Sequence, residues 1–211
     1  MFCGLAAAPL AGCDEMRRPP ERSIMPAVLL TPGPDPVRAA VDVLVPALAN
    51  QGQGLAGQTQ AAVRIVALLE YVTDAMIRDL RFSAVGNSVR VSLNIAREEV
   101  RQAAGIRTDA TVQPLIQALA GAYRALDIRD RNAAAAALPP SLFTPGRMPT
   151  LLKFNRLGPL PASEQAISQL QAEIRRLDEV GGWAGGAGAG GTQLGAGFVG
   201  SVLTPGLGQQ Y

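Results

Sequence analysis

The sequence predicts an all-α fold, a small bundle of about five amphipathic helices, from its composition, its apolar spacing and its turn residues. Hydrophobic residues make up 48% of the 211 residues and aromatic residues only 4%, a mixture that favours close-packed helices over a β-sandwich. Apolar residues recur at spacings of three and four in several segments, as on one face of a helix. We therefore expect one helical domain over residues 35–180, flanked by an N-terminal stalk and a Gly-rich tail.

The first expected helix begins at Asp35-Pro36, which offers an N-cap followed by proline at the first helical position. It should run to about residue 49, with Pro46 kinking or ending it. A Gly/Gln linker over residues 50–57 follows.

The second expected helix, over residues 58–80, has the clearest apolar face. Its apolar positions are Ala62, Ile65, Val66, Leu69, Val72, Met76 and Leu80. Charged residues are expected on its other side, namely Arg64, Asp74, Arg78 and Arg81.

Residues 85–95 fit two structures, because their apolar residues alternate as in a strand and also follow helical spacing. The segment length and the charged residues that follow favour a helix, which Gly105 should end. Further helices are expected after Thr111, over residues 133–138, and from a cap at Ser163 to about residue 180.

The residues that the chain lacks exclude several kinds of chemistry. It has no histidine, and its two cysteines, Cys3 and Cys13, both lie near the N-terminus. The body therefore offers neither a Ser-His-Asp triad nor a Cys or His metal ligand. We expect no catalytic residue, no metal and no cofactor, and the formal net charge of +2 gives no electrostatic reason to expect a nucleic-acid partner.

The N-terminal residues Leu10-Ala11-Gly12-Cys13 follow an apolar run of small side chains that lacks a preceding basic residue. This stretch resembles the lipobox of bacterial lipoproteins. The resemblance implies that residues 1–12 are a cleaved signal-like segment and that Cys13 is acylated and holds the protein on membrane lipid. Asp14 and Glu15 resemble a retention signal, so the implied location is the cell envelope, facing the periplasm, with the inner membrane favoured over the outer membrane. Residues 13–34, rich in Pro and Arg, are expected to form an extended stalk.

Residues 139–162 form an unusually long Pro-rich connection within the domain. One interpretation is a loop that wraps the bundle. The other is a partner-binding loop with aromatic anchors and cations for an anionic partner or a lipid headgroup, and its candidate residues are Phe143, Arg147, Lys153, Phe154 and Arg156.

The tail over residues 181–211 is a Gly-rich, low-complexity segment. It contains two G-x-G-x-x-G matches, which we reject because no predicted strand precedes them.

The favoured function is a non-catalytic, lipid-anchored envelope protein that acts as a helical binding or scaffold module, with a possible periplasmic protein partner. A carrier of lipid or of a small apolar ligand is one alternative. A cell-wall hydrolase using carboxylates is another, and it would draw on the pairs Glu98/Glu99, Glu70/Asp74 and Asp127/Asp130.

Overall fold

Seven α-helices and three 3₁₀ helices form the part of the chain that the computed structural model describes, residues 22–144 and 149–183. The predicted helical bundle is confirmed. Within this part, the one β-type pairing is an isolated bridge between Ile106 and Phe143, and none of the helices is both long and apolar enough to span a membrane. The elements are η2 (Ala27–Leu29), α1 (Pro36–Leu48), η3 (Ala49–Leu55), α2 (Thr59–Arg78), η4 (Leu80–Phe82), α3 (Asn87–Ala104), α4 (Val112–Asp127), α5 (Arg131–Ala136), α6 (Thr150–Asn155) and α7 (Pro161–Glu179).

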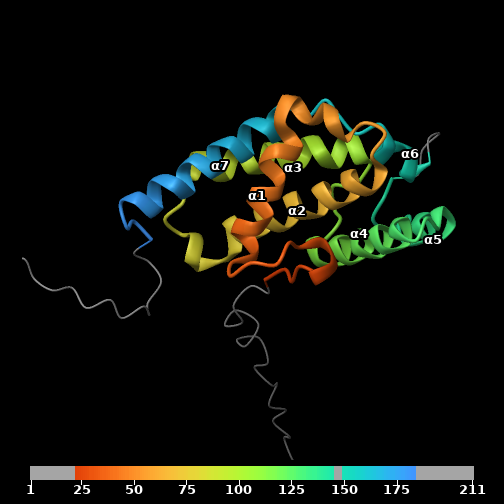
Figure 1. The fold of residues 1–211 in the computed structure, drawn as a ribbon, viewed down its shortest axis with the longest axis horizontal. Coiled ribbons are helices and arrows are strands. Elements are labelled where there is room, and N and C mark those ends of the chain that lie inside the picture. Colours follow the sequence, from red (N-terminus) through yellow and green to blue (C-terminus); the bar gives the residue numbers. More distant parts are fainter. Residues whose placement is uncertain (1–21, 145–148, 184–211) are drawn as a thin grey trace, which may run out of the picture.

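Helix α2 is the centre of the bundle and packs against α1, α3, α4 and α6. In the view of Figure 1, α3 and α7 lie together above α2. Helices α4 and α5 lie below α2. Because α2 is covered on several sides, two acidic residues of its polar side lie inside the protein, with Glu70 and Asp74 only 1% and 4% exposed. The expectation that Asp74 faces solvent is therefore wrong, and so is a core position for Leu80, which is 73% exposed.

Local sequence explains both ends of α1. The Asp35 carboxylate accepts a hydrogen bond from the Val37 backbone N–H at 2.9 Å, as predicted for the cap. Pro46 lies within the helix, which ends two residues later at Leu48. Asn50 and Gln51 then adopt positive φ angles of 53° and 58°, and the carboxylate of Glu164 accepts hydrogen bonds from both of their backbone N–H groups.

The segment that also fitted a strand is helical, because residues 87–104 form the single helix α3. Gly105 ends it in the left-handed region, at φ 70° and ψ 32°, as the sequence predicts. The Lys153 side chain lies against this glycine, so that a Cβ atom at residue 105 would collide with it.

Helix α7 begins earlier than predicted, because Pro161 and not a residue after Ser163 is its first residue. Ser163 is buried, and the carboxylate of Glu99 on α3 accepts hydrogen bonds from the backbone N–H groups of Ala162 and Ser163. A carboxylate at a helix N-terminus also interacts favourably with the helix dipole. The cap of α7 thus comes from a neighbouring helix, which the sequence around residue 163 does not reveal.

Residues 22–34 are not part of an extended stalk. Leu29 is fully buried and Met25 is 8% exposed, and the Arg64 guanidinium donates to the Leu29 carbonyl at 2.9 Å. Apolar side chains among the prolines let this segment pack on α2 and α4. The rest of the predicted stalk, with Cys13, Asp14 and Glu15, lies outside the described residues, as does the tail from residue 184.

Candidate anion-binding cleft

The two phenylalanines of the predicted partner-binding loop are core residues. Phe143 and Phe154 are 1% and 0% exposed, and their rings pack edge to face with centroids 6.1 Å apart. They cannot serve as anchors for a partner, because hydrophobic burial has already taken both into the bundle. Arg156 is exposed, Lys153 donates to the Thr144 carbonyl at 3.3 Å, and Arg147 lies outside the described residues.

Two of the three candidate carboxylate pairs lack the geometry that acid–base catalysis needs. Glu98 is exposed, while its neighbour Glu99 caps α7. Asp127 and Asp130 are both exposed, and Asp130 caps α5 by accepting from the Ala133 N–H at 2.9 Å. These carboxylates support helix ends or face solvent.

The third pair, Glu70 and Asp74, is buried, as the hydrolase alternative requires. Arg101 on α3 donates two hydrogen bonds to the Glu70 carboxylate, from Nε at 2.5 Å and from Nη2 at 2.9 Å. Such a bidentate pair is among the strongest in proteins. Both oxygens of the Glu70 carboxylate are thus occupied by Arg101, whereas a catalytic carboxyl group must lie within hydrogen-bond reach of the substrate.

Asp74 is held from two directions. The Arg78 Nε lies 2.8 Å from one carboxylate oxygen, and the Ser23 hydroxyl and backbone N–H both donate to the other. Ser23 therefore ties the N-terminal segment to α2. Both carboxylates of the pair have structural partners.

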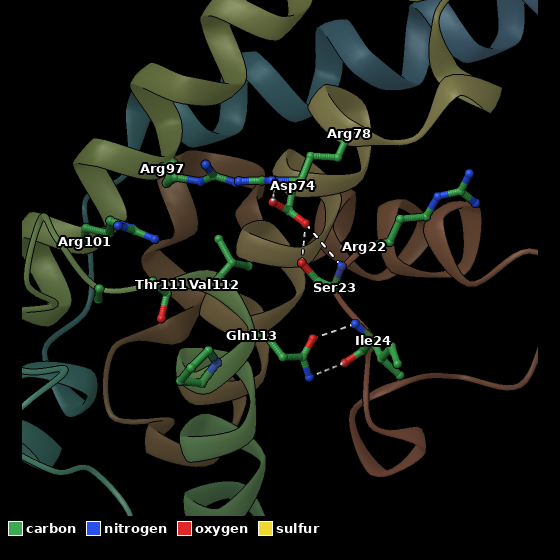
Figure 2. A pocket seen from close by; sticks show the side chains of 12 residues that line it. Arg22, Ser23, Ile24, Asp74, Arg78, Arg97, Arg101, Thr111, Val112 and Gln113 are labelled. Atoms are coloured by element: carbon green, nitrogen blue, oxygen red, sulfur yellow. Dashed lines mark hydrogen bonds and ion pairs between the residues drawn. The ribbon is translucent and has the colours of Figure 1, made fainter. Parts of the chain in front are cut away.

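A cleft of about 890 Å³ opens beside these ion pairs. Figure 2 shows Arg97 and Arg101 reaching in from α3, with Asp74 and Ser23 facing them. The beginning of α4, from Thr111 to Pro114, forms a further wall. Arg22 is at the rim, but its side chain points away from the centre in Figure 2 and lies 3.6 Å from Asp79.

The charges in this cleft do not cancel. Arg78, Arg97 and Arg101 face two carboxylates, and hydrogen bonds from Arg101 and from Arg78 with Ser23 occupy those carboxylates. Arg97 reaches the Glu70 carboxylate only as an ion pair, with Nε 3.3 Å from Oε2, and this buried Nε has no hydrogen-bond acceptor among the described residues.

Burial lowers the pKa of Arg97, because the charged guanidinium loses hydration, while the nearby Glu70 carboxylate raises it and Arg101 lowers it further. One of the five guanidinium N–H groups makes a hydrogen bond within the described structure, from Nη2 to the Glu70 carbonyl at 3.3 Å. Arg97 is thus a largely buried cation with spare donors.

An adjoining hollow of about 730 Å³ shares Arg97 and Arg101 with the cleft. Lys153 and Glu98 also line it, together with polar side chains such as Thr108 and Gln102. Lys153, predicted as a cation for an anionic partner, thus lines the same hollow as the two arginines, as does Thr144 of the predicted loop.

Most residues of this cleft were not predicted from the sequence as a binding site. Arg97 and Arg101 are four residues apart on one helix, as are Asp74 and Arg78 on another, and i,i+4 spacing places each pair on one face. This signal was visible, but such spacing is equally typical of solvent-exposed faces. The described residues contain no cluster of three acidic side chains able to hold a metal ion.

In comparisons with known proteins, no family model, no curated protein and no solved structure matches this chain. The arrangement of the cleft itself therefore carries the functional argument.

Proposed function

We propose that this chain is a non-catalytic, lipid-anchored binding module of the bacterial cell envelope, tethered through an acylated Cys13. The observation that carries the binding role is the open cleft with Arg97 at its wall, a largely buried guanidinium whose Nη2 group makes one hydrogen bond within the described structure. The candidate carboxylates are engaged elsewhere, which favours binding over hydrolysis. A carrier of apolar ligands is not favoured, because charged side chains from three elements line the cleft.

The position of the cleft fits a tether. Arg22 and Ser23, where the described chain begins, lie at its rim, and eight residues lie between Cys13 and Arg22, so that nine Cα-to-Cα steps join the two. Fully extended, that length spans at most about 32 Å. An acylated Cys13 would therefore keep the cleft near the membrane surface.

Metabolic labelling with a clickable fatty acid tests the anchor. The wild-type chain should carry the label, and the Cys13→Ser variant should lose both the label and its place in the membrane fraction. An unlabelled wild-type protein would contradict the proposal. The expected inner-membrane location is tested by Asp14→Ser, which should move the labelled protein toward the outer-membrane fraction if Asp14 acts as a sorting signal.

A further inference from the structure

We infer that the cleft between α2, α3 and the start of α4 binds a phosphate ester, with Arg97 as its principal ligand and Arg101 adding positive charge beside it. This inference rests on the proposed binding function and specifies the ligand class of that same site. The phosphate could belong to a lipid headgroup or to a free metabolite, since both present the same oxygens.

The guanidinium donors of Arg97 and Arg101 are occupied to different extents. Arg97 has spare N–H groups in the described structure, whereas Arg101 uses its Nη1 group on the Thr108 carbonyl at 3.2 Å and its other nitrogens on Glu70. Guanidinium groups match the tetrahedral oxygens of phosphate and can donate two parallel hydrogen bonds. An anion in the cleft would supply acceptors for the Nη groups of Arg97, of which one N–H bonds within the described structure.

Both guanidinium groups are charged and largely enclosed by the protein. The side chains of Arg97 and Arg101 are only 16% and 11% exposed, so their fields are less screened by solvent than those of surface arginines. Glu70 is already bound by Arg101. An incoming anion therefore meets an excess of positive charge where the two guanidinium groups lie side by side on α3.

The start of α4 forms a further wall of the cleft. Thr111 is the N-cap of α4, and its side chain makes no capping hydrogen bond. The first turn of α4 lines the cleft through Val112 and Gln113, so the positive end of a 16-residue helix adds to the attraction. Arginine side chains, not the helix end alone, remain the basis of the site.

The size of the cleft favours a small molecule or headgroup over a bare ion. About 890 Å³ lies within the range of small-ligand pockets. Val112 and Ile24 supply apolar surface beside the polar side chains, which suits an ester with a short organic group.

Two probes distinguish the source of the phosphate, and both use the full chain with Cys13→Ser so that acylation plays no part. Isothermal titration calorimetry measures binding of sn-glycerol 3-phosphate. Co-sedimentation compares vesicles of phosphatidylcholine alone with vesicles of equal parts phosphatidylcholine and phosphatidylglycerol. Binding to the anionic vesicles that glycerol phosphate displaces indicates a lipid headgroup. Binding of glycerol phosphate without vesicle binding indicates a soluble phosphate ester.

Arg97→Gln should weaken either interaction by roughly tenfold or more, because a hydrogen bond to a charged group contributes at least that factor. Arg175→Gln is the matched control, since Arg175 is exposed on α7, away from the cleft lining. Absence of binding to both probes, or equal loss in the two variants, would overturn the inference. Because acylation of Cys13 is measured separately in cells, failure here leaves the anchor untouched.

A second pair of variants guards against unfolding. Thr111→Asp and Thr111→Asn both place a favoured residue at the N-cap of α4, and they differ by one negative charge at the cleft. Both should melt at or above the wild-type temperature, while Thr111→Asp should bind at least about tenfold more weakly than Thr111→Asn. Equal affinities in two folded proteins would contradict a phosphate at this position.

Discussion

Replacing Arg101 by methionine should destabilise the protein strongly, because the substitution removes the main hydrogen-bond partner of a buried carboxylate. Glu70 is 1% exposed and accepts both of its shortest hydrogen bonds from Arg101. Removing one partner of a buried ion pair costs about 3–5 kcal/mol. Arg97 stays 3.3 Å from Glu70 and offsets part of the charge, so we expect about 3 kcal/mol, the low end of that range.

The size of this effect comes from the unpaired charge more than from the ion pair itself. A double variant, Glu70→Met with Arg101→Met, removes both charges and fills similar volume. Replacing a buried pair by apolar residues is often close to neutral, although Arg97 would then lose its own neighbour. The double variant should therefore lose less stability than Arg101→Met alone, with a coupling energy of about 1–3 kcal/mol.

Urea unfolding followed by far-ultraviolet circular dichroism at pH 7 measures these free energies. Arg175→Met serves as control, because Arg175 is exposed and donates only to Gln171 at 3.4 Å, and it should change stability by less than about 0.5 kcal/mol. A loss below about 1 kcal/mol for Arg101→Met, or a double variant as unstable as the sum of its single changes, would refute the reasoning.

Three further predictions concern the core, a helix end and pH. Phe154→Ala should cost about 3–5 kcal/mol of unfolding free energy, since this ring is fully buried, and a loss under about 1 kcal/mol would restore it as an exposed anchor. Gly105→Ala should lower the melting temperature, because it combines a φ of 70° with a collision against Lys153; Gly57→Ala, with φ 80° but open space around it, isolates the contribution of the collision. Hydrogen bonds from Arg38 and then Trp183 lower the pKa of Asp178 from 3.8 to about 2. Because the pKa of Asp178 is lower in the folded than in the unfolded state, its ionised carboxylate stabilises the protein at pH values above the unfolded-state pKa, and this stabilisation is lost as the pH falls from about 4 to about 2. Asp178→Asn should therefore flatten the pH dependence of the unfolding free energy in that window. An unchanged slope would argue against a stabilising ionised Asp178.

Local sequence was sufficient to place the helices. Apolar spacing located α2, α4 and α7, and Gly105 marked the end of α3, because these signals depend on residues within a few turns of one another. The same spacing resolves residues 87–104 as a helix once a full amphipathic length is considered.

Burial of polar residues was beyond local sequence. Glu70 and Asp74 carry the i,i+4 signature of a solvent face, yet α3 and residue Ser23 cover them. Whether a charged residue faces water or another helix depends on partners about 30 to 50 residues away in the chain, which helical spacing alone does not reveal.

The predicted role of the two phenylalanines as partner anchors was wrong, because local sequence does not show whether an aromatic side chain packs into the core. A Pro-rich segment with Phe143 and Phe154 fits both an exposed loop and a segment that inserts its rings into the core. The structure shows the second, and Lys153 of that segment still reaches the hollow beside Arg97 and Arg101.

The most direct test of the cleft is the side-chain Nε–H resonance of Arg97 in a ¹H–¹⁵N spectrum during titration with sn-glycerol 3-phosphate. Arg90 provides an internal control, because its buried Nε also lacks an acceptor among the described residues but the residue does not line the cleft. Assigned through Arg97→Gln and Arg90→Gln, the Arg97 signal should shift with saturation while the Arg90 signal stays in place. A static Arg97 signal, or equal shifts of the two, would contradict an anion site at Arg97.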